Sequence, residues 1–154
     1  MSRKLTACAH EKAIFTIKHR DKLISEAVKV LRTWRSHFDA IAVSGYSSAM
    51  TASIVASKLR KNLVLVRKES EERFSNHIVE GQHNQRVLFF DDLIDTGGTF
   101  RRIRNGVEKI GCRIVGVYLY NPGFRSIDYL SEDDLIDMNM TKEEWLEYNE
   151  SKST

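Results

Sequence analysis

The hydrophobic residues of this chain are concentrated in short runs that are separated by longer, mostly polar segments. Four of these runs lack the regular alternation of polar and apolar residues that marks a strand with one solvent-exposed face. They therefore predict strands that are buried on both faces. The four runs lie at residues 41–43, 63–66, 87–90 and 113–120. A further apolar stretch, at residues 13–17, is expected to form a short strand or an extended flap.

Three segments show helical periodicity, one before the first of these strands and two between strands. A first helix is expected to begin at Asp21, which is well placed as its cap. Its apolar face consists of Leu23, Ala27, Val30, Leu31 and Trp34. Residues 49–61 are rich in alanine and serine and form the second expected helix. The third covers residues 98–110 and is closed by Gly111. Its apolar stripe consists of Phe100, Ile103, Val107 and Ile110.

Strands that alternate with helices predict a single α/β domain, residues 1–154, with a mainly parallel sheet and helices on both faces. The core is expected at about residues 21–120. Right-handed crossovers place the loops 44–48, 67–86 and 91–99 at one edge of the sheet, where ligands bind in such folds. The strongly polar segment 70–85 is long for a loop in a compact domain, which is typical of functional or mobile loops.

Composition excludes several classes of protein. The net charge of the 154 residues is +3, which favours neither a nucleic-acid nor a membrane surface as partner. No apolar run approaches the roughly 20 residues of a membrane helix, and residues 1–20 lack the apolar core of a signal peptide. Cys8 and Cys112 are isolated, so neither a disulfide framework nor a zinc site is indicated. We therefore expect a cytoplasmic protein.

The candidate chemistry is concentrated in residues 87–100, which read VLFFDDLIDTGGTF. A buried strand is followed by Asp91 and Asp92, and then by Asp95. Next come Thr96, Gly97, Gly98 and Thr99, which lead into a helix. The two glycines allow successive N–H groups to point into one concavity, and a helix N-terminus favours an anion. This turn is therefore expected to bind a phosphate monoester.

The acids beside this turn imply that the ligand carries more than a phosphate. Asp91 and Asp92 are suited to accept hydrogen bonds from a sugar diol or to hold a hydrated Mg²⁺. They are also suited to stabilise positive charge that develops on a sugar carbon. The alternative for either residue alone is a structural one, in which it caps the loop or pairs with a basic residue.

Three other sites are excluded by residue pattern. A Walker P-loop requires a lysine after its glycines, whereas Gly98 is followed by Thr99 and Phe100. No GxGxxG motif follows any expected strand, which removes a Rossmann dinucleotide site. A phosphotransfer receiver domain needs a phosphoacceptor aspartate on a later strand, and only one clear strand is expected after residue 110.

Residues 87–99 resemble the phosphoribosyl pyrophosphate (PRPP) motif of type I phosphoribosyltransferases. Two weaker similarities stand in the expected order: residues 44–48 are similar to the pyrophosphate loop of the family, and residues 67–69 to the start of its flexible catalytic loop. The resemblance covers about residues 41–120. It implies the type I phosphoribosyltransferase fold, with a small hood built from the termini, residues 1–20 and 121–154.

The resemblance also implies a function in nucleotide salvage or related nucleotide metabolism. PRPP and a nucleobase would be converted, with Mg²⁺, into a nucleoside monophosphate and pyrophosphate. The Mg²⁺ would be held mainly through PRPP, with Asp91 and Asp92 as candidate ligands. A homodimer is the implied assembly. No nucleic-acid or membrane partner is expected. The alternative is a non-catalytic regulator that binds PRPP or a nucleotide with the same fold.

Residue roles follow from the same resemblance. Asp91 and Asp92 would contact the ribose hydroxyls, and Asp95, Thr96, Gly97, Gly98 and Thr99 would bind the 5′-phosphate. Ser44, Gly45, Tyr46, Arg67 and Lys68 would bind the pyrophosphate. Asp95, Lys68 and Arg67 would take part in catalysis, the last two by closing over the leaving group.

The acceptor base stays open at this point. An acid at Asp95 slightly favours a purine with an oxo group, whereas Arg67-Lys68-Glu69 is more typical of orotate members. A capping role for Asp95 is an equal alternative. The loop 44–48 also lacks the basic residue that several branches of the family carry beside Gly45.

For several other polar residues, a position on the solvent-exposed surface is the first expectation. His77 is expected to be a solvated surface residue, and the alternative is that His77 or Arg73 closes over the leaving group, as the resemblance implies. Arg101, Arg102 and Arg104 lie off the apolar stripe of their helix and are expected to form a solvated face.

Overall fold

The computed structural model describes residues 4–5, 14–68, 76–92 and 98–119, and the backbone of residues 123–126. Its centre is a six-stranded sheet with the strand order β3-β2-β1-β4-β5-β6. The strands are β1 (Ala40–Val43), β2 (Asn62–Val66), β3 (Val79–Glu80), β4 (Arg86–Asp91), β5 (Arg113–Leu119) and β6 (Gly123–Ser126). The four central strands are parallel, and β3 and β6 pair antiparallel with them at the two edges. The predicted mainly parallel sheet is confirmed.

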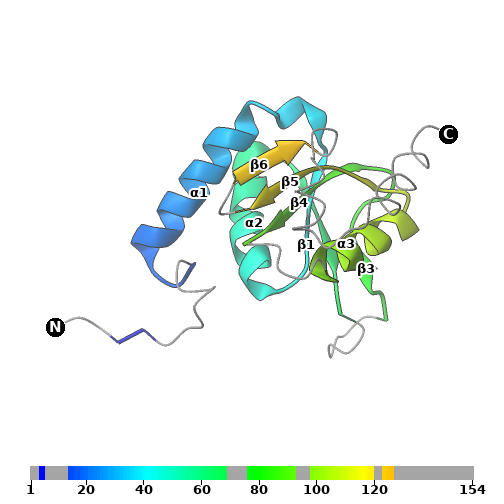
Figure 1. Ribbon diagram of the computed structural model, residues 1–154, viewed down its shortest axis with the longest axis horizontal. Coiled ribbons are helices and arrows are strands. Elements are labelled where there is room, and N and C mark those ends of the chain that lie inside the picture. The colour runs from blue at the N-terminus through cyan, green and yellow to red at the C-terminus, as the bar shows by residue number, and fades with distance from the viewer. Residues whose placement is uncertain (1–3, 6–13, 69–75, 93–97, 120–122, 127–154) are drawn as a thin grey trace.

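Helices cover both faces of this sheet, as predicted. They are α1 (Ile17–Arg32), α2 (Tyr46–Leu59) and α3 (Gly98–Lys109), with a 3-10 turn η2 (Arg35–His37) between α1 and β1. Helices α1 and α2 lie side by side on one face, and α3 lies on the other (Figure 1). The three loops expected at the carboxyl edge of the sheet therefore follow β1, β2 and β4.

Alternation along the strands divides the core into two layers. In β1, Ala40 and Ala42 pack toward α3, whereas Ile41 and Val43 pack toward α1 and α2. The layer under α3 includes Phe89, which meets Phe100 of α3 edge to face at a centroid distance of 5.2 Å. All four residues of β1 are apolar and buried, and the polar residues Asp39 and Ser44 flank the strand.

Three local expectations are corrected by the structure. In the stretch 13–17, the described residues 14–16 form no strand, and α1 begins at Ile17. The buried face of α1 consists of Ile24, Ala27, Val28 and Leu31, and Val30 is 39% exposed. The apolar residues of α1 form one broad face, and packing against α2 and the sheet buries only part of it. Helix α2 begins three residues earlier than expected, because Gly45 takes φ +103° before it.

Two strands were missed by sequence reasoning. Strand β3 lies inside the segment 70–85 and is only two residues long, which is too short for a periodic signal. Strand β6 pairs antiparallel with β5, so the sheet continues past residue 120. The predicted cap at Gly111 is confirmed, since this residue has φ +73° two residues after the end of α3 and its N–H donates to the Glu108 carbonyl.

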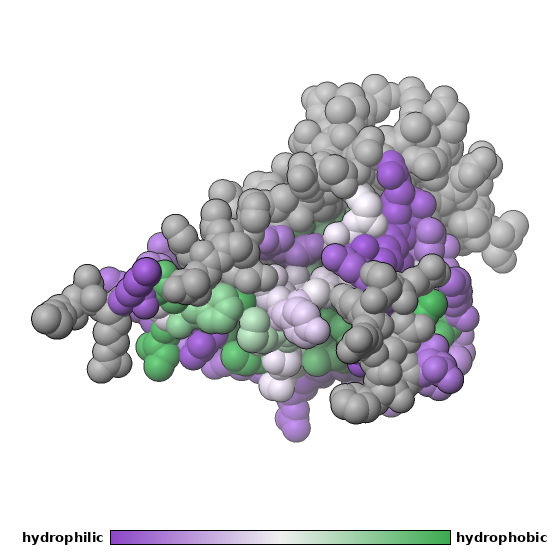
Figure 2. Space-filling model, turned by 90° about the horizontal axis from the view of Figure 1, so that it is seen from below, coloured by the Kyte–Doolittle hydropathy of each residue, from purple (hydrophilic) through white to green (hydrophobic). Residues whose placement is uncertain are grey.

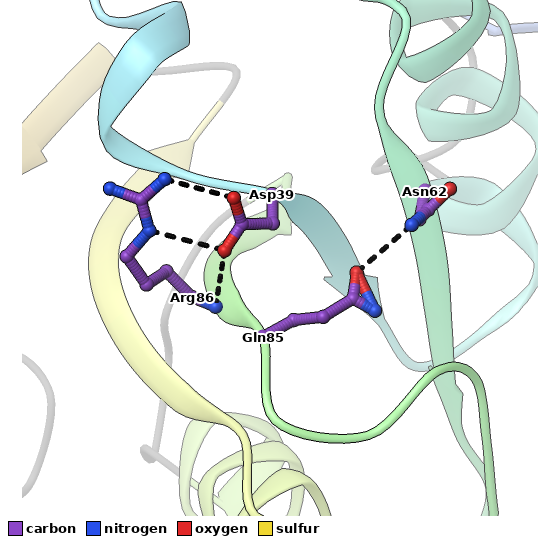
Figure 3. A network of polar contacts seen from close by, with 4 residues as sticks. All are labelled: Asp39, Asn62, Gln85 and Arg86. Atoms are coloured by element: carbon purple, nitrogen blue, oxygen red, sulfur yellow. Dashed lines mark hydrogen bonds and ion pairs between the residues drawn. The ribbon is translucent and has the colours of Figure 1, made fainter.

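A polar network joins the amino ends of three strands (Figure 3). The guanidinium of Arg86 donates two hydrogen bonds to the Asp39 carboxylate, at 2.9 and 3.1 Å, and the Arg86 backbone N–H donates a third, at 2.9 Å. The side-chain amide of Asn62 donates to the Gln85 side chain at 3.1 Å. These contacts set the starts of β1, β2 and β4 level with one another.

Replacing Asp39 with Ala should lower the free energy of unfolding by about 1 kcal/mol at pH 7, the size expected for a partly exposed, bidentate ion pair. Arg86 lowers the pKa of Asp39 from 3.8 to about 2. The contribution of this carboxylate is therefore complete above its unfolded pKa and is lost as the pH falls through the folded pKa. Urea titrations from pH 7 downward should show the gap between wild type and variant closing only below about pH 4. Asp21→Ala, at an exposed site on α1, is the matched control. Equal stability of Asp39→Ala and wild type at pH 7 would contradict this account.

Candidate functional site

The carboxyl edge of the sheet brings together the loops that the sequence singled out. Strands β1, β2 and β4 run parallel and end at Val43, Val66 and Asp91. Figure 2 shows the face seen from below in Figure 1, where hydrophilic residues dominate the right part, on the side of α3 and β3. Two side-chain contacts connect the loop after β1 with its neighbours: one reaches β4, and the other reaches α3.

Asp91 is the centre of the first contact. It is the last residue of β4 and only 8% exposed. Its Oδ1 atom accepts a hydrogen bond from the Ser48 hydroxyl at 2.7 Å and another from the Asp92 backbone N–H at 2.8 Å. Burial raises the pKa of Asp91 from 3.8 to about 6, although the Ser48 hydrogen bond acts in the opposite direction. A carboxyl group in this position changes its protonation state close to neutral pH.

Ser48 was not among the predicted site residues, although it lies in the loop 44–48 that was. It is 1% exposed on the first turns of α2, and its hydroxyl is directed at the carboxylate rather than at solvent. Asp92 is half-buried beside Asp91. The two acids are thus adjacent at the end of β4, but only one of them is enclosed by protein.

The loop after β1 has the geometry of an anion-binding helix start. Gly45 adopts φ +103°, which strains any residue with a side chain, while a Cβ there would have open space around it. Its carbonyl accepts the first helical hydrogen bond of α2, from the Ala49 N–H at 3.1 Å. The N–H groups of the residues between them lie at the positive end of the helix. Tyr46 is 81% exposed there, and Ser44 is only 6% exposed.

Arg102 makes the second contact and corrects an expectation from the sequence. It was placed on a solvated face of α3, yet its side chain is half-buried. Its Nε and one terminal nitrogen donate to the Ser44 hydroxyl at 3.2 and 3.1 Å. One signal in the sequence pointed this way: the loop 44–48 carries no basic residue, which leaves a place for a cation from another element.

The residues after β2 form the opposite wall of this edge. Arg67 pairs with Glu80 of β3 at 3.0 Å, and its backbone N–H donates to the carbonyl of Ile78 at 2.8 Å. Lys68 is exposed. A pocket with a volume of about 520 Å³ lies between this segment and α3. His77 is exposed, as expected, and Arg73 lies outside the described residues.

The structure describes only part of the segment that is expected to bind a phosphate, residues 95–99. Asp95, Thr96 and Gly97 lie outside the described residues. Gly98 is the first residue of α3 and is exposed, and Thr99 is half-buried. The motif therefore ends at a helix N-terminus, which is the position that favours a phosphate.

The acids at the end of β4 fit a Mg²⁺ ion that is bound mainly through its ligand. Carboxylate oxygens are hard donors, and Mg²⁺ is commonly held by one or two of them together with substrate phosphates. Within the described ranges, no group of three or more histidine, cysteine, aspartate or glutamate residues is placed to bind a metal. Among the same residues, no helix combines the length and the apolar character needed to cross a membrane.

Comparison with known proteins identifies orotate and adenine phosphoribosyltransferases as relatives of this chain. No family model matches the chain. Orotate phosphoribosyltransferase of Porphyromonas gingivalis is 27% identical over 120 residues, which is 76% of this chain and 57% of that protein. Adenine phosphoribosyltransferase of Symbiobacterium thermophilum is 31% identical over 111 residues, 56% of this chain and 64% of that protein. The chain thus spans about 60% of the length of these two relatives.

A solved structure shows the same fold. Adenine phosphoribosyltransferase of Saccharomyces cerevisiae, in complex with adenine and an imino-altritol bisphosphate, superimposes with a TM-score of 0.60. The match covers 83% of this chain and 79% of the yeast chain, at 18% sequence identity.

Replacing Ser48 with Ala should raise the pKa of Asp91 above its value of about 6, because the hydroxyl that stabilises the charged form is removed. Carbon-detected NMR titration of the side-chain carboxyl measures this shift directly. Ser53→Ala on the same helix, whose hydroxyl donates to the Met50 carbonyl instead, should leave the Asp91 titration unchanged. An Asp91 midpoint that stays in place in Ser48→Ala would show that this hydrogen bond does not act on the carboxylate.

Proposed function

Because the chain has the type I phosphoribosyltransferase fold and is similar in sequence to orotate and adenine phosphoribosyltransferases, we propose that it transfers a phosphoribosyl group to a base. The donor is PRPP, the acceptor is a nucleobase, and the reaction depends on Mg²⁺. The products are a nucleoside monophosphate and pyrophosphate. The observation that carries this proposal is the adjacent pair Asp91 and Asp92 at the carboxyl end of β4, next to the start of α2.

The two acids bind the ribose in this proposal. Carboxylates accept hydrogen bonds from the 2′ and 3′ hydroxyls, and such charge-assisted bonds are stronger than neutral ones. The Ser48 hydroxyl and the Asp92 N–H keep the Asp91 carboxylate in one orientation. An anion below the ribose also stabilises the oxocarbenium-like carbon that forms when pyrophosphate leaves.

Helix starts bind the two phosphate ends. The turn formed by Asp95, Thr96, Gly97, Gly98 and Thr99 binds the 5′-phosphate at the N-terminus of α3. Ser44, Gly45 and Tyr46 bind the pyrophosphate at the N-terminus of α2. Both sites use backbone N–H groups that have no partner within the helix.

Cations assist departure of the leaving group. Arg67 and Lys68 stand at the end of β2, across the edge from Asp91, and contact the pyrophosphate as it leaves. Asp91 or Asp92 would hold Mg²⁺ together with PRPP, and the ion would supply positive charge that favours departure of the pyrophosphate.

A purine is the slightly favoured acceptor, and orotate is the second candidate. The acid at Asp95 supports an oxo-purine, since it can exchange a proton with the base. The segment that begins with Arg67 and Lys68 supports orotate. The direct test combines purified protein with PRPP, Mg²⁺ and a panel of purine and pyrimidine bases, and pyrophosphate release is measured. Binding of PRPP by calorimetry without turnover of any base would instead select a non-catalytic regulator.

We also propose that the protein is cytoplasmic and forms a homodimer through α2. Met50 and Tyr46 on this helix are 45% and 81% exposed, which leaves apolar surface available to a second copy. Sedimentation equilibrium should give twice the mass of the 17.8 kDa chain. A monomer mass at micromolar concentration would refute the dimer.

The double substitution Asp91→Asn with Asp92→Asn should weaken PRPP binding by about 10- to 100-fold, because two charge-assisted hydrogen-bond acceptors are lost. Isothermal calorimetry with PRPP and Mg²⁺ measures the loss, and the melting temperature shows that the fold is retained. Glu26→Gln, an exposed acid on α1, serves as the control. Wild-type affinity in the double variant would refute the ribose-binding role.

A further inference from the structure

One flank of α3 carries a polar stripe that the proposed reaction does not use in full. Arg102 lies three and four residues before Asn105 and Gly106, and Lys109 lies four and three residues after them, so these residues share one side of the helix. This stripe is separate from the apolar stripe of α3, which includes Phe100, Ile103 and Val107 and packs on the sheet. It faces the pocket of about 520 Å³ beside β2.

Gly106 gives the pocket its floor. A Cβ atom at this position would lie 2.7 Å from Cγ1 of Val66 and 3.1 Å from Cγ2 of Val79. Helix α3 therefore approaches β2 and β3 more closely here than a residue with a side chain would allow. Gly106 also lines the pocket, together with Arg102 and Lys109 one turn before and one turn after it on the same helix.

Cationic side chains line the pocket on two sides, from the end of β2 and from α3. The eight residues around the pocket are Val66, Arg67, Lys68, Ile78, Arg102, Asn105, Gly106 and Lys109. Four of the eight are arginine or lysine and none is acidic, so the lining is strongly positive. The Nε atom of Arg67 is buried and makes no hydrogen bond to any residue that the structure describes. Its terminal nitrogen pairs with Glu80, which lies outside the lining.

We propose that this pocket is a binding site for a diphosphate group, with Arg102 and Lys109 of α3 as ligands that lie outside the PRPP-like motif. The volume is within the range of small-molecule sites, roughly 300–1,000 Å³. Cations on two walls match a ligand with negative charge at both ends better than a single phosphate. Arg102 also donates to Ser44, so an anion that draws on this guanidinium affects the loop before α2.

Two kinds of ligand carry such a diphosphate group. One is the diphosphate of PRPP or the released pyrophosphate, and this arm rests on the proposed function. In it, Arg102 provides the cation that the loop 44–48 lacks. The other is a separate diphosphate, such as that of a nucleoside diphosphate, which acts on the loop through Arg102 and Ser44. Both sources predict the same contacts with Arg102, Asn105 and Lys109.

The test measures binding of pyrophosphate and of inorganic phosphate by calorimetry, with the full chain and without a base or turnover. Wild type should bind pyrophosphate more tightly than phosphate. Lys109→Gln should weaken pyrophosphate binding roughly fivefold, and Asn105→Asp, which adds a negative charge, by roughly tenfold or more. Lys58→Gln, an exposed lysine on α2, is the matched control and should not change it. Melting temperatures verify that each variant folds.

Each outcome decides one point. Unchanged pyrophosphate binding in both Lys109→Gln and Asn105→Asp, or equal affinity of wild type for phosphate and pyrophosphate, overturns the diphosphate site. A parallel rise of KM for PRPP in Lys109→Gln identifies the PRPP diphosphate as the occupant, whereas an unchanged KM identifies a separate diphosphate. Pyrophosphate binding that persists in a protein that converts no base refutes the proposed reaction and leaves the pocket assignment standing.

Discussion

The pairing of β1 with β4 holds the rest of the structure in register. It aligns Ala40 with Val87 and Ala42 with Phe89, in the middle of a sheet that is buried on both faces. A shift by one residue would turn each apolar side chain to the opposite layer. Polar contacts secure both ends of this pair: Asp39 with Arg86 at the amino end, and the Ser48 hydroxyl with Asp91 at the carboxyl end. The candidate site is therefore built onto the most constrained part of the fold.

Helix α3 serves the core and the candidate site at the same time. Its apolar face, with Phe100 and Ile103, packs on the sheet, and its N-terminus at Gly98 belongs to the proposed phosphate site. A second face carries Arg102 and Lys109 toward β2. Gly106 allows both roles, because close packing against Val66 brings the cationic face to the end of the strand. A small shift of this helix would therefore change both the packing of the core and the positions of the cations beside β2.

Charges of opposite sign are separated along the carboxyl edge. The acids stand at the end of β4, and Arg67 and Lys68 stand at the end of β2, with β1 between them. In the proposed function, a ligand with a sugar at one end and a diphosphate at the other meets hydrogen-bond acceptors at the end of β4 and donors at the end of β2. The partial burial that raises the pKa of Asp91 shows the cost of a carboxylate at this position, and the Ser48 hydrogen bond offsets part of it.

Sequence alone determined the strands β1, β2, β4 and β5, the three helices, the sheet class and the acid-glycine motif, because periodicity and turn residues are local signals. Residues 93–97 of that motif, with Asp95, lie outside the described residues and keep their roles as predictions. Tertiary structure decided which polar residues meet. Ser48 and Asp91 are 43 residues apart, and Ser44 and Arg102 are 58 apart. No local pattern encodes such contacts, since they depend on strand order and on how closely α3 packs against β2.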